Sequence, residues 1–193
     1  LEKRSVESLW RTLLWVRGLG ISDADILRTL HQFPQALETD PESRDGMVLW
    51  LKEFGLSELD IAKLFSKCPA LFTVLRSTTE STAQWLAELG FDKNSIRDLL
   101  HRAPTLFCLK TTNLKAKSAF LKGIGFSDAQ IIQLMLRIPT VFDRSLDKNL
   151  KPRFALLEQQ VSAGKLVDFV KTRGSSWFMC KMADCSDRIQ SSL

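Results

Sequence analysis

The sequence predicts an all-α fold, a curved α-solenoid built from about five tandem helical repeats of 35 residues. Two regularities predict it. Four prolines recur at intervals of 35 residues, and four glycines recur at the same interval, fourteen residues ahead of them: Pro34, Pro69, Pro104 and Pro139, and Gly20, Gly55, Gly90 and Gly125. A fixed period of this size is typical of stacked helical repeats. We therefore expect function on a long shared surface rather than in one catalytic pocket.

The first helix of each repeat is predicted from an apolar stripe that ends just before the glycine. Its positions are separated by steps of three and four, as one buried helix face requires. The stripe contains Trp15, Trp50, Trp85 and Phe120, then Val16, Leu51, Leu86 and Leu121, then Leu19, Phe54, Leu89 and Ile124. The glycine is expected to end this helix in the left-handed conformation.

The second helix of each repeat begins two residues after the glycine position, at a polar residue that suits a helix N-cap. These caps are Ser22, Ser57, Asp92, Ser127 and Ser162. Three residues later, Asp25, Asp60, Ser95 and Gln130 can reach back to them in a loose capping box. The buried face is predicted from Ile26, Ile61, Ile96, Ile131 and Leu166, followed four residues later by Leu30, Phe65, Leu100, Met135 and Val170.

The proline is expected to stop the second helix, because the residue before proline is pushed out of the α region. An apolar side chain then plugs a short turn, at Leu37, Phe72, Phe107, Phe142 and Trp177. The predicted domain is a single one over residues 1–193. Its repeats span about 5–39, 40–74, 75–109 and 110–144. A degenerate repeat follows at 145–179, where Gln160 replaces the glycine and Gly174 the proline. A further helix is expected to begin at about residue 178 and to form a C-terminal cap over 180–193.

The charge is mildly basic overall but uneven along the chain. The net charge is +5, and no apolar run approaches the length of a membrane helix, so we expect no membrane contact. Residues 20–91 hold 6 Lys and Arg against 11 Asp and Glu, a net of −5, whereas residues 92–153 hold 12 against 5, a net of +7. A basic segment of this kind favours polyanions as partners.

The four cysteines, Cys68, Cys108, Cys180 and Cys185, follow no familiar metal or disulfide spacing. We interpret them as buried or idle thiols of a reducing compartment rather than as a metal site. The chain begins at Leu1 rather than at methionine, so we expect any transit peptide to lie in an upstream segment.

The string L-G-[IFL]-S-x3-I-x3-[LFM]-x3-P-x2-[LF] occurs over 19–37 and nearly unchanged over 54–72, 89–107 and 124–142. It resembles the repeat of the mitochondrial transcription termination factor (mTERF) family, and the resemblance covers about 170 residues. Tetratricopeptide and pentatricopeptide repeats place their signature residues elsewhere. The resemblance implies units of two α-helices and one short 3₁₀ helix in a left-handed superhelix. It also implies nucleic-acid binding in mitochondria or chloroplasts, with no shared catalytic residues. This chain is shorter than the DNA-binding members, and its first half is acidic.

Two groups of cations are candidates for a nucleic-acid surface. The first is a column two residues before the prolines, Lys67, Arg102 and Arg137, whose regular spacing suits a phosphate track. The alternative is that each cation complements the dipole of its own helix. The second group lies in the basic segment and contains Lys110, Lys115, Lys117, Lys122, Arg144, Lys148, Lys151 and Arg153. Its alternative is a solvated charged face. Arg17, Lys52 and Lys122 also share a slot, which Ala87 interrupts, and are interpreted as surface residues.

The remaining residue types argue against an enzyme. The aromatic residues fall on the helix stripes that must fill the core, so we do not interpret them as base-stacking platforms. His31 and His101 share a slot without a repeated cysteine, serine or carboxylate beside them, and are interpreted as surface residues near the basic column. No catalytic residue, metal site or cofactor is predicted.

We therefore expect a non-enzymatic organellar protein that binds structured RNA, favouring ribosomal RNA in or near an organellar ribosome. The mitochondrion is the expected location and the chloroplast the alternative. The preference for RNA rests on length, since about five repeats with one basic half offer a short track. One alternative function is a duplex-DNA-binding factor for transcription termination or regulation. Another is a protein–protein scaffold whose helical surface recruits an enzyme or a ribosomal or other organellar protein. In the RNA-binding hypothesis, the acidic half is expected to face proteins.

Overall fold

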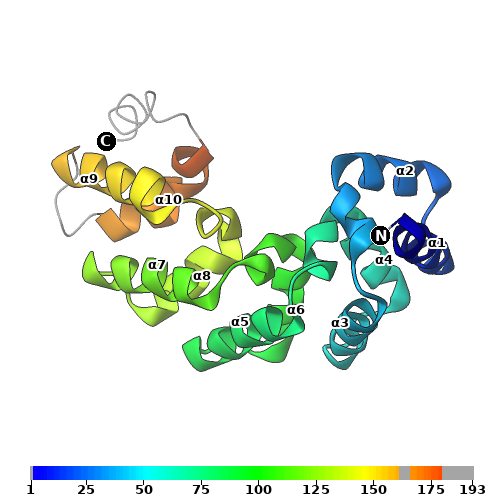
Figure 1. Ribbon diagram of the computed structural model, residues 1–193. Coiled ribbons are helices and arrows are strands. Elements are labelled where there is room, and N and C mark those ends of the chain that lie inside the picture. Colours follow the sequence, from blue (N-terminus) through cyan, green and yellow to red (C-terminus); the bar gives the residue numbers. More distant parts are fainter. Residues whose placement is uncertain (1, 161–165, 180–193) are drawn as a thin grey trace. The chain divides into compact units, whose positions relative to one another are not determined.

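The computed structural model describes residues 2–160 and 166–179, and every regular element in these ranges is a helix. The chain divides into two compact units, the N-terminal unit Leu1–Thr111 and the C-terminal unit Thr112–Leu193. In Figure 1 the N-terminal unit runs from blue to green, and the described part of the C-terminal unit runs from green to orange-red. The single domain, the handedness of the superhelix and the number of repeats stay predictions.

The N-terminal unit contains three successive sets of two α-helices and one 3₁₀ helix. The elements are α1 (Glu2–Gly18), α2 (Asp23–Gln32), η1 (Pro34–Glu38), α3 (Pro41–Glu53), α4 (Glu58–Lys67), η2 (Pro69–Phe72), α5 (Arg76–Leu89), α6 (Lys93–Arg102) and η3 (Pro104–Cys108). Each element contacts its counterpart in the next set: α1 contacts α3 and α3 contacts α5, α2 contacts α4 and α4 contacts α6, and η1 contacts η2 and η2 contacts η3. This is the stacking that the 35-residue period predicts.

The C-terminal unit begins with the same sequence of elements. They are α7 (Thr111–Gly123), α8 (Asp128–Arg137), η4 (Pro139–Val141), a single π-helical turn η5 (Leu146–Leu150), α9 (Lys151–Gln160) and α10 (Leu166–Met179). Phe154 of α9 lies in the middle of an aromatic cluster in this unit. Its ring centroid is 5.6 Å from that of Phe120, 6.1 Å from that of Phe126 and 5.9 Å from that of Phe178.

The predicted glycine turns and helix caps are confirmed. Gly20, Gly55, Gly90 and Gly125 have φ values of 76°, 88°, 110° and 98°, in the left-handed region that favours glycine. Ser22, Ser57, Asp92 and Ser127 each accept a hydrogen bond from the backbone N–H three residues later. The reciprocal bond of a full capping box is present at Ser57–Asp60 and at Ser127–Gln130. Ser162 lies outside the described residues.

The proline stops are confirmed in the first four repeats. Each of the four prolines is the first residue of a 3₁₀ helix. The residues before them, Phe33, Cys68, Ala103 and Ile138, have φ between −146° and −137° and ψ between 62° and 73°, outside the α region.

Most members of the predicted columns form the core, but seven are only half-buried: Trp15, Leu19, Leu30, Phe54, Leu89, Phe120 and Ile124. Val16, Leu51, Leu86 and Leu121 are each 0% exposed, and the five aliphatic residues of the second helix, from Ile26 to Leu166, are at most 3% exposed. The plugs Phe72, Phe107 and Phe142 are also buried. The side chains of Leu37 and Trp177 lie outside the described part of the structure. Trp50 and Trp85 are buried, as expected of core residues rather than base-stacking platforms.

The end of the chain differs from the repeat prediction in one respect. Helix α10 continues through Gly174 to Met179, so residues 178 and 179 end this helix instead of starting a new one. The reason is that Gly174 stands where the other repeats have proline, and glycine keeps the backbone N–H that helix continuation needs. Residues 180–193, the predicted cap, lie outside the described residues.

Candidate nucleic-acid interface

The cation column before the prolines is divided between the two units. Lys67 and Arg102 belong to the N-terminal unit, and Arg137 belongs to the C-terminal unit. All three side chains are exposed, each in the last turn of its helix, α4, α6 or α8. The column as one continuous phosphate track stays a prediction.

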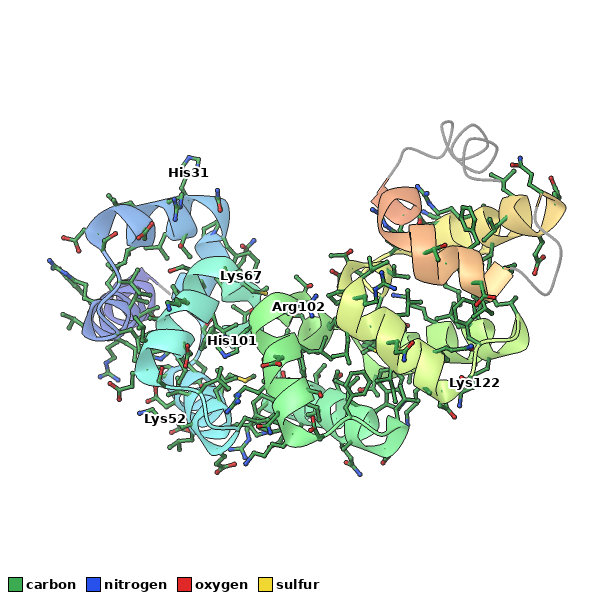
Figure 2. The ribbon with its side chains drawn as sticks, turned by 180° about the vertical axis from the view of Figure 1, so that it is seen from behind. His31, Lys52, Lys67, His101, Arg102 and Lys122 are labelled. Carbon is green, nitrogen blue, oxygen red and sulfur yellow. The ribbon has the colours of Figure 1, made fainter. Side chains whose placement is uncertain are left out.

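Lys67 has a structural partner in the neighbouring repeat. Its Nζ donates to the carbonyl oxygens of His101 at 2.6 Å and Arg102 at 3.0 Å, which are among the last carbonyls of α6 (Figure 2). These carbonyls lack partners within their own helix, and a cation there also complements the helix dipole. Lys67 therefore links α4 to α6: it stands in the last turn of its own helix, and its ammonium binds carbonyls at the end of the next one.

The lysines around α7 fall into three environments. Lys110, just before the helix, and Lys115, within it, are exposed, and neither forms an ion pair with any residue that the structure describes. Lys122 is paired with Asp128, with 2.6 Å between Nζ and Oδ1. Lys117 is buried, only 6% exposed, and its Nζ donates to the carbonyl of Phe142. Burial lowers the pKa of Lys117, while the charge of nearby Asp143 raises it.

The four cations in the second half of the predicted cluster also lie in different environments. Arg153 is 2% exposed and its Nε donates to Asn149 Oδ1 at 3.1 Å. Lys151 is exposed and paired with Asp147 at 2.6 Å. Arg144 is half-buried and Lys148 is exposed. Because Lys117 and Arg153 have their side chains inside the C-terminal unit, we leave both out of the interface proposed below.

Arg144 and Lys148 line an open groove with a volume of about 540 Å³, here called the Arg144 groove. Its other lining residues are Thr140, Asp143, Ser145 and Asn149, so it offers two cations, two hydroxyls and an amide against one carboxylate. Ser145 caps η5 by accepting a hydrogen bond from the backbone N–H of Lys148 at 3.2 Å. The buried ammonium of Lys117 lies close enough to Asp143 to interact with its charge. The groove therefore presents donors and positive charge that suit a phosphate group.

Ion pairs that were not predicted from the sequence connect the two helices of a repeat across the glycine turn. Arg17 binds Asp23 at 3.1 Å, Lys52 binds Glu58 at 2.9 Å, and Lys122 binds Asp128 in the same way. Figure 2 shows Lys52 and Lys122, each within its own unit. The signal was present, since an acidic residue follows each of these cations after six positions. These cations therefore have a local structural role.

In the third repeat both members of this ion pair are replaced, by Ala87 and Lys93. Lys93 instead donates to the carbonyl of Glu53 at 2.8 Å and lies 5.7 Å from the ring centroid of Phe54. The cation at the start of α6 therefore binds the end of α3, which connects the third repeat to the second.

The two histidines lie in the N-terminal unit, where Figure 2 shows both. His31 is exposed and His101 is half-buried, next in sequence to Arg102 of the column. The described residues contain no group of three or more His, Cys, Asp or Glu side chains placed to hold a metal ion. Among the helices of the described ranges, none combines the length and apolar character needed to cross a membrane.

Comparisons with known proteins agree with the repeat architecture. No curated protein matches the chain. The family model described as mTERF matches residues 4–172, which include the described repeats from α1 into α10. On this match, this helical-repeat chain belongs to the mTERF family.

Proposed function

We propose that this protein binds structured RNA, specifically ribosomal RNA in or near a mitochondrial ribosome, through exposed cations of the C-terminal unit. The family supports the general part of this proposal, because mTERF proteins are helical-repeat proteins that bind nucleic acid, are generally non-enzymatic and generally work in organelles. The RNA target, the ribosome and the mitochondrion are our inference.

The observation that carries the proposal is the Arg144 groove in a unit of strongly positive charge. By sequence, residues 112–193 hold 13 Lys and Arg against 7 Asp and Glu, a net of +6, while residues 1–111 hold 14 against 15, a net of −1. The positive charge of the chain therefore belongs to the C-terminal unit. Lys115, Arg144 and Lys148 are its cations that make no side-chain hydrogen bond or ion pair within the described residues.

We place these three residues at the centre of the interface, and at its margin the exposed cations of the same unit, Lys122, Arg137 and Lys151. Arg102 and Lys110 lie in the N-terminal unit and stay predicted site residues outside this interface. Lys122 and Lys151 can bind phosphate only by exchanging or sharing their present carboxylate partners. Lys67 we assign to the stacking of repeats, because its ammonium binds two carbonyls of α6.

RNA is favoured over duplex DNA because the cationic surface extends over only a short part of the chain. A protein that follows duplex DNA neutralises many phosphates along a uniform cationic surface. Here the charge is concentrated in one unit and its groove offers two cations. Folded RNA brings phosphates from several strands close together, and its loops and bulges are the usual targets of specific recognition.

A protein–protein scaffold is the second candidate, and one observation favours it. The large hydrophobic side chains that are exposed among the described residues all lie in the N-terminal unit: Trp10, Leu14, Leu27, Leu49, Leu59 and Leu75. Four of the six, Leu27, Leu49, Leu59 and Leu75, belong to the acidic segment 20–91. A surface of this composition suits a protein partner better than a polyanion.

The proposal is tested by measuring affinity for ribosomal RNA fragments and for duplex DNA of equal charge across a salt series. We expect tighter binding to RNA at every salt concentration. Equal or tighter binding to duplex DNA would remove the preference for RNA. Co-sedimentation of the protein with ribosomes rather than with nucleoids in organellar lysate is the expected cellular result. For the scaffold, the expected result is the opposite: no salt-dependent affinity for either nucleic acid.

A further inference from the structure

Two cysteines that are far apart in sequence lie in contact in the N-terminal unit. The Sγ atoms of Cys68 and Cys108 are 3.9 Å apart, although 40 residues separate them. Cys68 lies between α4 and η2, and Cys108 is the last residue of η3. The two 3₁₀ helices belong to successive repeats and contact each other. The thiols therefore meet across the boundary between the second and third repeats, and no disulfide joins them.

Neighbouring contacts hold both cysteines in place. The backbone N–H of Cys68 donates to Leu64 at 2.7 Å, which fixes it at the end of α4. On the other side, the hydroxyl of Thr79 donates to the carbonyl of Phe107, next to Cys108, at 3.3 Å. Lys67, next to Cys68, binds the end of α6 in the same third repeat. The register of the two cysteines is thus set by contacts that do not depend on sulfur.

The distance between the sulfur atoms suits a disulfide. A disulfide bond is about 2.05 Å long, so the two Sγ atoms must approach by about 2 Å. Rotation of a cysteine side chain about its Cα–Cβ bond moves Sγ over such a distance without a change in the backbone. The Sγ of Cys108 contacts the carbonyl of Pro104 at 3.8 Å, a weak interaction that such a rotation gives up at little cost.

The two thiols differ in exposure, and this difference determines which of them reacts first with an oxidant. Cys108 is half-buried, whereas Cys68 is 5% exposed. A small oxidant in solution therefore reaches Cys108 first. Cys68, already in contact with Cys108, is then placed to act as the resolving thiol.

We propose that Cys68 and Cys108 are a modification site at which a low-molecular-weight disulfide, of the glutathione disulfide class, converts the two thiols into an intramolecular disulfide. The Cys108 thiolate attacks one sulfur of the oxidant, forms a mixed disulfide and releases one thiolate. The Cys68 thiolate then attacks the Cys108 sulfur, forms the internal bond and releases the second thiolate. The two protons lost by the cysteines are taken up by the released thiolates. One oxidant is reduced to two thiols while two cysteines are oxidised.

The bond would cross-link the second and third repeats of the N-terminal unit. Stacked repeats are connected mainly by contacts with their neighbours, so a covalent bond at one boundary makes the two repeats unfold together. This inference does not rest on nucleic-acid binding, because neither cysteine belongs to the interface proposed above.

The test uses the full chain, equilibrated in buffers of increasing ratio of oxidised to reduced glutathione. Remaining thiols are alkylated, and the peptides are mapped without reduction. We expect a peptide pair linked through Cys68 and Cys108, and a melting temperature about 5–15 °C higher in the oxidised protein. The double variant Cys180→Ser/Cys185→Ser should keep both effects. Cys108→Ser should lose both, and its reduced form should melt close to the reduced wild-type protein.

Three results would overturn the proposal. The first is a glutathione adduct that stays on Cys108 while Cys68 remains a thiol. The second is a linked peptide that joins Cys108 to Cys180 or Cys185. The third is full alkylation of both Cys68 and Cys108 at the most oxidising ratio. Cys68→Ala provides a further check that does not depend on the melting measurement, since it should trap the Cys108 adduct that the wild-type protein resolves.

Discussion

The leucines of α3 offer a matched test of the predicted core. Leu49 and Leu51 lie two residues apart on the same helix, but Leu51 is 0% exposed and Leu49 is 59% exposed. Leu51 belongs to the repeating column of core residues, and Leu49 does not. Replacement of each by alanine removes the same atoms and changes helix propensity equally. The difference between the two variants therefore reports burial alone.

The expected magnitude follows from this exposure. Removing a fully buried leucine side chain costs about 2–5 kcal/mol, from lost transfer free energy and from the cavity that remains. A substitution on an exposed face usually changes stability by no more than about 0.5 kcal/mol. For a chain of this length, about 2–4 °C of melting temperature corresponds to each kcal/mol, so Leu51→Ala should melt about 4–20 °C lower.

Urea unfolding followed by far-UV circular dichroism measures both variants. We expect Leu51→Ala to lower the unfolding free energy by at least about 2 kcal/mol and Leu49→Ala to stay close to wild type. Equal losses in the two variants would refute the assignment of the column to the core. So would a loss at Leu49 that exceeds the loss at Leu51.

Three further predictions test individual residues. Gly125 has φ of 98°, Gly123 does not lie in the left-handed region, and neither has a neighbour that an added Cβ would meet. Gly125→Ala should therefore lower the unfolding free energy by about 1–2 kcal/mol, while Gly123→Ala leaves it equal or higher. Equal losses of the two variants in thermal unfolding would contradict this. Burial lowers the pKa of Lys117 in the folded chain, so the unfolded chain binds this proton more tightly. The unfolding free energy of wild type, measured against that of Lys117→Met, should therefore rise as pH increases toward 10.5, the usual pKa of a lysine. A flat or falling difference would count against a buried ammonium. Lys67→Met should lower the unfolding free energy by about 0.3–1 kcal/mol and barely change RNA affinity, whereas a large loss of RNA affinity with unchanged stability would return Lys67 to the interface.

Much of the fold could be predicted from the sequence because its determinants are local and repeated. The glycine at φ of 110° in the third repeat, the cap at Ser57 and the non-helical residue before Pro104 each follow from the chemistry of one or two residues. Four copies of the same pattern make such local signals hard to mistake. Where a signal is lost, as at Gly174, the helix continues and the repeat pattern no longer predicts its end.

The candidate site was harder to predict because a charged side chain looks the same in a sequence whether it is exposed or buried. Lys115 and Lys117 are two residues apart on α7, yet one is exposed and the other binds the carbonyl of Phe142 inside the unit. The Arg144 groove also needs Thr140 and Asn149, whose proximity to Arg144 depends on how η4 leads into η5. The contact between Cys68 and Cys108 depends on stacking between repeats, which spacing along the chain does not display.

The central claim is that cations of the C-terminal unit bind RNA, and two triple variants with the same loss of charge test it most directly. One removes Lys115, Arg144 and Lys148, and the other removes the exposed cations Arg28, Lys52 and Lys63 of the N-terminal unit, each by glutamine substitution. The measurement is affinity for a structured ribosomal RNA fragment as a function of salt. We expect the first variant to lose about tenfold or more in affinity and to flatten the salt dependence by roughly two to three released ions, while the second stays close to wild type. Equal losses in the two variants, or no loss in the first, would contradict the claim.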